Sequence, residues 1–210
     1  MKIIVLGCGN IGSVVARDLA ESMPSAQIAM ADLDKSRVEE AVSKIGRGNV
    51  SWVQVDATNQ HELVENLKKS DLAVGTLPGS FGFQACKAAI TAKVDMVDVS
   101  YMPEDVMILD KAALKSNVCI IPDCGMSPGL GNILVGHAIS RLDNVEAVFM
   151  LNGGLPEKPV PPLGYVITWS VRDLIDMYSR KVTIVKEGKV VKVEAMSGLE
   201  MITFPAVGNL

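Results

Sequence analysis

The amino-acid sequence predicts a doubly wound α/β fold, in which helices cover both faces of a parallel sheet, followed by a smaller α+β domain. Two observations support this prediction. Short apolar runs rich in β-branched residues alternate with longer stretches of helical periodicity until about residue 140. Each apolar run is nearly continuous in hydrophobicity, which is typical of strands buried on both faces of a parallel sheet.

The expected strands are the apolar runs Lys2–Leu6, Gln27–Ala31, Val50–Val55, Leu72–Thr76, Asp95–Val99 and Val118–Ile121. The expected helices are Ile11–Ser22, Lys35–Ile45, Asn59–Lys69, Phe81–Thr91, Glu104–Lys115 and Gly131–Arg141. Asn59 and Glu62 have the spacing of a capping box, and Ser80 can cap the fourth helix. Strands and helices that alternate in this way predict the strand order 3-2-1-4-5-6.

The pattern changes after Arg141. Sequence features there predict a strand at Val145–Leu151, a proline-rich loop at Gly153–Gly164 and a helix at Ser170–Tyr178. They also predict a hairpin, in which Val182–Lys186 and Val190–Ala195 flank Glu187-Gly188-Lys189. We therefore expect two domains, residues 1–124 and 125–210.

Composition excludes several classes of protein. The chain has 49% hydrophobic residues and a net charge of −4 without blocks of like charge, which argues against a disordered chain and against nucleic-acid binding. The first residues lack the apolar core of a signal peptide and no run approaches a membrane span, so we expect a cytoplasmic protein. The four cysteines and two histidines have no zinc-site spacing, so no metal site is predicted.

A glycine-rich turn carries the clearest chemical signal. The motif Gly7-Cys8-Gly9-Asn10-Ile11-Gly12 follows the first strand and opens the first helix, which is the context of a Rossmann dinucleotide site. Gly7 permits the tight turn, Gly9 lets the backbone approach a diphosphate, and Gly12 lets the helix pack closely, while the helix N-terminus offers N–H groups, including those of Asn10 and Ile11, to the anion. The alternative is a purely structural turn.

Asp32 ends the second strand, twenty residues after Gly12. A carboxylate there can accept both ribose hydroxyls and repel a 2′-phosphate, so the sequence predicts NAD as coenzyme in preference to NADP. Lys35 and Arg37 stand nearby and could weaken that preference, although first-turn charges are usually solvated.

Further candidates follow other strands at the same sheet edge. Asp56, Ala57 and Thr58 would meet the adenine, with an ordinary turn or helix cap as the alternative for Asp56. The other expected coenzyme contacts are Leu77 and Pro78 after the fourth strand and Met126 after the sixth.

Several motifs together resemble the saccharopine dehydrogenase-related family, across essentially the full 210 residues. They are the glycine fingerprint, Leu77-Pro78-Gly79, Val99-Ser100-Tyr101 and Gly125-Met126-Ser127-Pro128-Gly129, with Gly153–Pro156 and Pro162–Arg172. The resemblance is closest to the lysine 6-dehydrogenase branch. It implies an NAD-dependent oxidation of an amine-bearing carbon to an imine that water hydrolyses, with L-lysine as substrate.

The chain departs from the family in two respects. Saccharopine-forming and saccharopine-cleaving relatives usually carry Asp and His where this chain has Ser127 and Asn132, which argues against saccharopine as substrate. Relatives also continue well past the equivalent of Leu210, so we expect an incomplete second domain. The alternative to an intact enzyme is therefore a non-catalytic NAD-binding module or one half of a split enzyme.

Candidate chemical roles follow from the loops at the sheet edge. Asp123 is the first choice as ammonium anchor or base, and Tyr101 can relay a proton, with a turn aspartate and a packed tyrosine as the alternatives. Ser100 and Ser127 are expected to contact the amine or amino-acid substrate. Arg172 could hold its carboxylate with Trp169 beside it on one helical face, or could pair with Asp173 or Asp176.

The chain is also expected to associate with itself. The predicted hairpin Val182–Ala195 leaves an unpaired strand edge, which invites a partner. We expect a homodimer.

Overall fold

The computed structural model describes residues 1–162, 164–205 and 207–209. Leu163, Ala206 and Leu210 lie outside the described residues, and Leu163 belongs to the stretch Pro162–Arg172 that carries part of the family resemblance. The chain divides into two compact units, residues 1–155 and 156–210, which are described separately below. The domain boundary expected at 124/125 stays a prediction.

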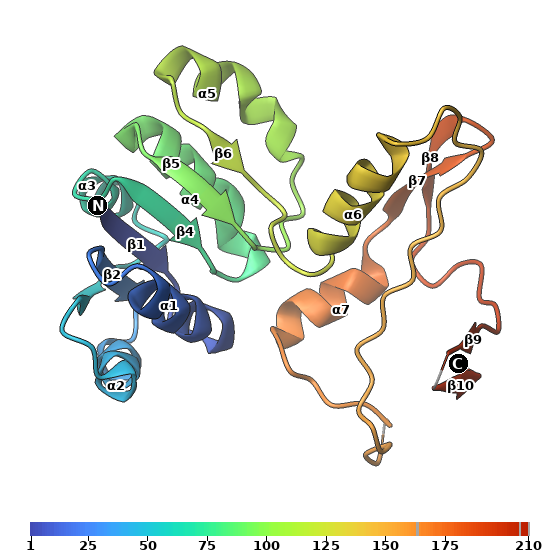
Figure 1. The fold of residues 1–210 in the computed structure, drawn as a ribbon, viewed down its shortest axis with the longest axis horizontal. Coiled ribbons are helices and arrows are strands. Elements are labelled where there is room, and N and C mark those ends of the chain that lie inside the picture. The colour runs from blue at the N-terminus through green and yellow to red at the C-terminus, as the bar shows by residue number, and fades with distance from the viewer. Residues whose placement is uncertain (163, 206, 210) are drawn as a thin grey trace. The chain divides into compact units, whose positions relative to one another are not determined.

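The first unit contains a six-stranded, fully parallel sheet in the order β3-β2-β1-β4-β5-β6 (Figure 1). This is the predicted doubly wound topology, so the fold class is confirmed. The strands are β1 (Lys2–Leu6), β2 (Gln27–Asp32), β3 (Val50–Gln54), β4 (Leu72–Gly75), β5 (Asp95–Asp98) and β6 (Ile120–Ile121).

Helices cover both faces of this sheet (Figure 1). On one face α1 (Asn10–Ser22) and α2 (Lys35–Ile45) bury small and β-branched side chains such as Ala16 and Val38 against β1 and β2. On the other face α3 (Gln60–Leu67) and α4 (Gly79–Ala92) form a second core around Leu63 and Cys86. Because all six strands run parallel, their carboxyl ends lie at the same edge of the sheet.

Several predicted bounds are wrong in detail. The helix α4 begins at Gly79 with Pro78 as its N-terminal cap residue, two residues before the expected start, so Ser80 lies inside the helix rather than capping it. The expected helix Glu104–Lys115 is a 3₁₀ turn, η1 (Val106–Leu109), followed by α5 (Asp110–Ser116). The last sheet strand is two residues long, since Val118 and Cys119 precede it.

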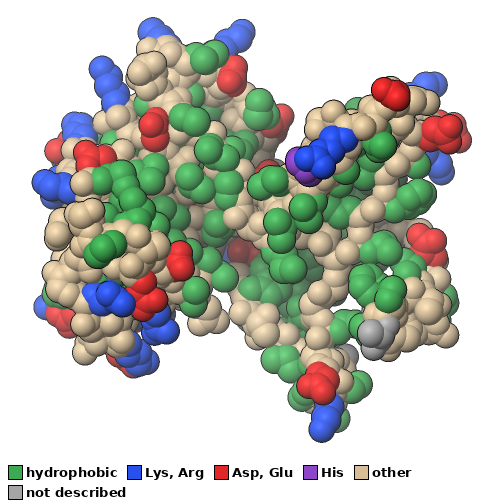
Figure 2. All heavy atoms as spheres, viewed as in Figure 1, with side chains coloured by type: hydrophobic (Ala, Val, Ile, Leu, Met, Phe, Trp, Pro, Cys, Tyr) green, Lys and Arg blue, Asp and Glu red, His purple; other side chains and the backbone are tan. Residues whose placement is uncertain are grey.

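The end of the first unit differs most from expectation. Residues Val145–Leu151 do not form the predicted strand and belong to none of the sheets found among the described residues. The helix α6 (Leu130–Ile139) is mostly apolar, with Asn132 and His137 as its polar residues, yet none of its residues is buried. Ile133, Leu134 and Phe149 are among the exposed large hydrophobic residues of this segment. Figure 2 shows that hydrophobic side chains reach the surface at many points of the molecule.

The second unit contains α7 (Val171–Ser179), a hairpin of β7 (Val182–Lys186) and β8 (Lys189–Val193), and the short pair β9 (Thr203–Phe204) and β10 (Gly208–Asn209). Glu187 and Gly188 both have positive φ, so the hairpin closes through a two-residue turn rather than the expected three. Whether its exposed edge pairs with a second copy stays a prediction.

Candidate coenzyme-binding site

The turn between β1 and α1 has the geometry of a phosphate loop. Gly7 has φ +96°, a conformation that suits glycine, and its N–H donates to the Ala31 carbonyl over 2.7 Å. Gly9 is the N-cap of α1, and no side chain caps this helix end. The first-turn N–H groups of an α-helix have no partner within the helix, so this end can receive an anion.

The three motif glycines face different surroundings. A Cβ on Gly12 would lie 2.0 Å from the Gly7 carbonyl oxygen, so this glycine is needed for the helix to approach the strand. A Cβ on Gly9, in contrast, would meet no protein atom within 4 Å. The protein itself therefore does not require glycine at position 9, whereas a diphosphate approaching the backbone there would, and the loop fits a dinucleotide.

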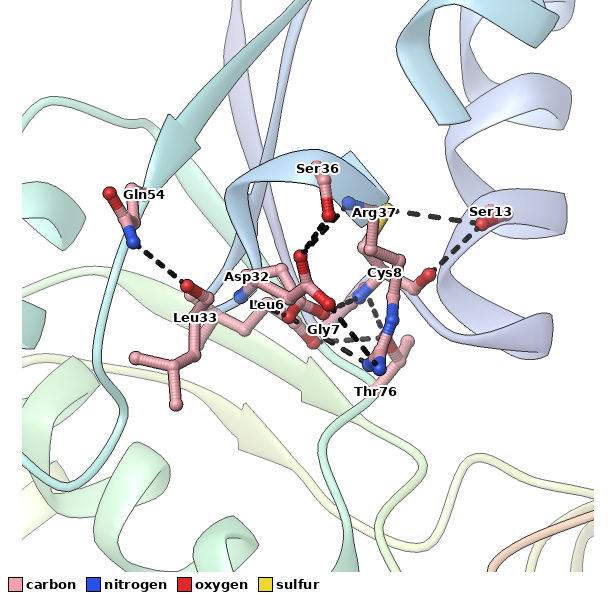
Figure 3. Close-up of polar contacts among 11 residues, drawn as sticks. Leu6, Gly7, Cys8, Ser13, Asp32, Leu33, Ser36, Arg37, Gln54 and Thr76 are labelled. Atoms are coloured by element: carbon pink, nitrogen blue, oxygen red, sulfur yellow. Dashed lines mark hydrogen bonds and ion pairs between the residues drawn. The ribbon is translucent and has the colours of Figure 1, made fainter. Parts of the chain in front are cut away.

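Asp32 lies against this loop (Figure 3). Its carboxylate accepts the Cys8 N–H over 2.7 Å and the Asp34 N–H over 3.0 Å, and 12% of its side chain is exposed. Both carboxylate oxygens already have a backbone donor. Asp32 therefore ties the end of β2 to the phosphate loop, in addition to any contact with a ribose.

Arg37, on the first turn of α2, supplies positive charge beside Asp32 (Figure 3). Its guanidinium lies 3.9 Å from the Asp32 carboxylate and 3.8 Å from the Asp34 carboxylate. Asp34 caps α2 by accepting the Arg37 N–H, and Ser36 donates its hydroxyl to Asp34. The Arg37 side chain is 57% exposed, so the guanidinium is held loosely and remains available to an anion.

Thr76 joins the phosphate loop to the neighbouring strand, a role not predicted from the sequence. Its hydroxyl lies 2.9 Å from the Leu6 carbonyl oxygen and 3.0 Å from that of Gly7, and its N–H donates to Leu6 as well (Figure 3). A threonine directly after a strand, opposite a glycine fingerprint, is the signal that could have found it.

The expected adenine contacts at Asp56, Ala57 and Thr58 stay a prediction. The Asp56 carboxylate accepts both the N–H and the hydroxyl of Thr58, and these bonds lower its pKa. Asn59 caps α3 by accepting the Glu62 N–H. The turn alternative is thus present in the structure, and the Asp56–Thr58 turn lies at the edge where the adenine would bind.

Loops after β4, β5 and β6 bring the remaining candidates of the first unit to the same sheet edge. Leu77 and Pro78 follow β4, and Ser100 and Tyr101 follow β5. Ser100 is buried, and its hydroxyl donates to Asp98 rather than facing solvent. Its contact with a substrate stays a prediction.

After β6 come Asp123, Met126 and Ser127, all exposed. Asp123 has φ +56°, which turns the chain out of the strand. The protein around its carboxyl raises its pKa by desolvation, in the direction that suits a base.

In the second unit, Trp169 and Arg172 do not share a helical face as predicted, because α7 begins at Val171 with Ser170 as its cap and Trp169 precedes it. The Trp169 indole N–H donates to the Tyr165 hydroxyl over 3.4 Å. Asp176, one expected partner of Arg172, pairs with Arg180 instead, over 3.3 Å.

The described residues contain neither a metal-binding cluster nor a membrane-spanning helix. They contain no group of three or more His, Cys, Asp or Glu side chains arranged to hold a metal ion. No helix among them combines the length and the apolar character that a membrane crossing requires.

Residues 3–121 match the family description "Saccharopine dehydrogenase NADP binding domain", a match to more than half of the chain. The chain belongs to the saccharopine dehydrogenase family. A second match, to "Saccharopine dehydrogenase C-terminal domain", covers residues 125–209. The predicted family is thus confirmed.

Two curated relatives illustrate this membership of the saccharopine dehydrogenase family. The saccharopine dehydrogenase (NADP(+), L-glutamate-forming) of Pyricularia oryzae is 26% identical over 201 residues, which cover 91% of this chain and 43% of the relative. The mitochondrial alpha-aminoadipic semialdehyde synthase of Bos taurus is 28% identical over 210 residues, covering 96% of this chain and 22% of the relative.

A solved structure shares the fold. The apo histidine-tagged saccharopine dehydrogenase (L-Glu forming) from Saccharomyces cerevisiae matches with a TM-score of 0.67 and 20% identity, over 92% of this chain and 44% of that one. The chain spans less than half the length of all three of these proteins.

The expected preference for NAD over NADP is wrong for a member of the saccharopine dehydrogenase family. The matching family description is an NADP-binding domain, and the Pyricularia relative is named as NADP(+)-dependent. The inference failed because it treated Asp32 as a free carboxylate that repels phosphate. In the structure two backbone N–H groups bind that carboxylate, and Arg37 offsets its charge.

Proposed function

We propose that this chain binds NADP(H) and contributes to the oxidation of an amino acid at a carbon that bears nitrogen. The observation that carries the proposal is the phosphate loop with open space at Gly9 and an arginine beside the ribose position. Family membership supports the reaction class, since the Pyricularia relative is named as an NADP(+)-dependent saccharopine dehydrogenase.

Arg37 is proposed to select the phosphorylated coenzyme. A 2′-phosphate on the adenine ribose would approach the end of β2, where the guanidinium already lies within 4 Å of two carboxylates. The exposed guanidinium can turn from Asp34 to the phosphate, since an exposed ion pair is worth little and an arginine–phosphate pair is stronger. The Ser36 hydroxyl, which donates to Asp34, lies in the same turn.

The residues at the sheet edge are proposed to divide the remaining work. When bound, the nicotinamide supplies the hydride acceptor. Asp123 accepts a proton from the substrate ammonium so that its nitrogen lone pair is available, and its raised pKa brings the carboxylate closer to the pH at which this transfer is efficient. Tyr101, next to the buried Ser100, lines the same edge and passes a proton to or from solvent.

The substrate is proposed to be an amino acid with a secondary or primary amine, with saccharopine tested first and L-lysine second. Saccharopine takes first place because the Pyricularia relative carries it in its name. Ser127 in the loop after β6 and Asn132 in the first turn of α6 depart from the family pattern and keep L-lysine as the alternative. A purified chain that binds coenzyme and reduces it with neither amine would be a binding module rather than a dehydrogenase.

The coenzyme assignment is tested by titrating NADPH and NADH into the wild type and an Arg37→Ala variant, with fluorescence as the readout. Loss of a charge-assisted contact costs roughly 1.5–3 kcal/mol, so we expect NADPH to bind about 10- to 100-fold more weakly to the variant, with NADH little changed.

Arg47→Ala is the matched control for this titration. Arg47 forms a comparable exposed ion pair with Glu21, over 3.4 Å, at the opposite edge of the sheet. Equal losses of NADH and NADPH in Arg37→Ala, or tighter binding of NADH by the wild type, would refute the role of Arg37.

Turnover is measured as NADPH appearance at 340 nm. Saccharopine and L-lysine are each supplied with NADP, and Asp123→Asn is the variant. We expect a rise in absorbance with one amine and a large loss in Asp123→Asn at unchanged NADPH affinity. A flat trace with both amines, in a chain that binds NADPH, would contradict the dehydrogenase activity.

A further inference from the structure

A buried carboxyl lies at the end of β5, one residue before the Val99-Ser100-Tyr101 segment. Asp98 is 0% exposed, a rare state for an aspartate. Its carboxylate accepts the Ser100 N–H over 2.7 Å and the Ser100 hydroxyl over 3.1 Å. None of the ion pairs found among the described residues involves it.

The Asp98 carboxyl also packs against the end of β4. A Cβ on Gly75 would lie 1.8 Å from the Asp98 Oδ2 atom, so only a glycine leaves room for the carboxyl. The next residue, Thr76, holds the phosphate loop through its hydroxyl. The Asp98 carboxyl thus packs against Gly75, the residue directly before Thr76, and Thr76 holds the loop that would bind the diphosphate.

Two further elements close around the same point. A Cβ on Gly82 of α4 would lie 2.7 Å from the Ser100 Cβ atom, so α4 packs tightly against the turn that Asp98 holds. The Asp98 carbonyl accepts the Cys124 N–H over 2.8 Å, which fixes the start of the loop after β6. The last residue of β4, the turn after β5 and the loop after β6 therefore all contact this one residue.

A carboxyl in this position is sensitive to protonation. The pKa of Asp98 is raised to about 6, mainly because burial desolvates the carboxylate; the two Ser100 bonds lower the pKa and the charge of Asp123 raises it, and both effects are already included in this value. The other titratable groups near it are the thiols of Cys86 on α4 and Cys124, whose own pKa values burial and the Asp98 charge raise. Both thiols are neutral at pH 6, so they carry no charge while Asp98 titrates.

We propose that Asp98 is a positioning residue of the coenzyme site, whose ionised carboxylate holds the Ser100–Tyr101 turn against the ends of β4 and β6. The ionised form accepts both Ser100 donors. Protonation turns one oxygen into a donor, so Ser100 must reorient its hydroxyl and the turn loosens. The coenzyme half of the proposal rests on the NADP(H) site proposed above.

The first test does not involve a coenzyme. Amide chemical shifts of Ser100 and Tyr101 are followed by NMR from pH 4.5 to 8. We expect both amides to titrate together with a midpoint near 6, the pKa of Asp98. In Ser100→Ala the Tyr101 amide should titrate at a higher pH, because a bond that lowers the pKa is lost, and in Asp98→Asn neither amide should titrate there.

Asp95→Asn is the matched control. Asp95 lies at the other end of β5, and its carboxylate also accepts a backbone N–H, that of Cys119, over 2.8 Å. This variant should leave the Ser100 titration unchanged. The absence of a Ser100 titration in the wild type, or its persistence in Asp98→Asn, would overturn the proposal whether or not a coenzyme binds.

The second test measures NADPH affinity over the same pH range. The 2′-phosphate of NADPH titrates near pH 6 in every sample, so the ratio of wild-type to Asp98→Asn affinity is the quantity of interest. We expect this ratio to rise by about fivefold or more between pH 5 and 8. A constant ratio would indicate a merely structural role and would overturn the coenzyme half.

If the Ser100 amide reports the Asp98 titration but the chain binds no NADPH at any pH, the proposed function is refuted, and so is the role of Asp98 in coenzyme binding. The positioning of the turn would then stand on the NMR result alone.

Discussion

Alanine substitutions at two glycines of the phosphate loop separate folding from coenzyme binding. In Gly12→Ala the new Cβ would lie 2.0 Å from the Gly7 carbonyl oxygen and 2.6 Å from the Thr76 hydroxyl. Backbone and helix must move apart, and overpacking of this kind costs about 1–3 kcal/mol of the free energy of unfolding. We expect Gly12→Ala to be less stable and to bind NADPH poorly.

Gly9→Ala should behave differently because its Cβ meets no protein atom within 4 Å, and Gly9 has φ −76°. Alanine is a poorer N-cap than glycine but also restricts the unfolded chain, so the two effects oppose each other and the net change should stay within about 1 kcal/mol. The methyl group would instead occupy the space of the diphosphate. We expect NADPH affinity to fall by about 10- to 100-fold, which corresponds to roughly 1.4–2.7 kcal/mol.

The assay combines urea denaturation without coenzyme and NADPH titration of the wild type, Gly9→Ala, Gly12→Ala and Gly48→Ala. Gly48 is the control, since a Cβ there also meets nothing within 4 Å and the residue precedes β3, at the opposite edge of the sheet. Unchanged NADPH affinity in Gly9→Ala, at unchanged stability, would refute the placement of the diphosphate.

Three further substitutions test contacts around the loop. Thr76→Val should lower the free energy of unfolding by about 1 kcal/mol and weaken NADPH binding, by urea denaturation and fluorescence titration, because the hydroxyl that faces the Leu6 and Gly7 carbonyls is lost. Gly75→Ala should cost about 2 kcal/mol or more, and in a double-mutant cycle with Asp98→Ala the two losses should be less than additive, since the clash is with the Asp98 carboxyl. The Asp98 pKa rises from 3.8 to about 6 on folding, so its proton contributes stability that is fully present below pH 4 and lost as pH rises through 6. Urea denaturation of Asp98→Asn and wild type should therefore show the wild type losing about 2 kcal/mol relative to the variant between pH 4 and 7, and a pH-independent difference would contradict the assignment.

The sequence predicted the sheet well because its central strands are buried on both faces. Residues 3–6 of β1 and most of β4 had to be apolar, and the helices between the strands had one apolar face, so both periods were visible. Prediction failed where tertiary contacts decide the outcome. Val145–Leu151 has the composition of a strand, but a strand also needs a neighbour to pair with, and this segment belongs to none of the sheets formed by the described residues.

Site residues were predictable where a backbone conformation demanded one residue type. Gly7 and Gly12 are such positions, and the structure gives each a steric reason. Asp98 could not be found in this way, because an aspartate at a strand end is ordinary in sequence, and its burial depends on Gly75 in another strand. Nor could the charge balance at Asp32 be read from spacing, because it depends on which donors already bind the carboxylate.

The two buried or nearly buried carboxylates of the first unit have opposite electrostatic settings, and this contrast argues for different roles. Asp32 has a guanidinium at 3.9 Å, and its charge is therefore partly balanced before any ligand arrives. Asp98 is buried, which desolvates its carboxylate, and another carboxylate lies near it, so its ionised form costs folding free energy near neutral pH although two Ser100 donors partly stabilise it. An asparagine could keep both Ser100 contacts without that cost, donating to the hydroxyl and accepting the N–H. The ionised group is therefore expected to have a use that a neutral isostere lacks, and Asp98→Asn measures it directly.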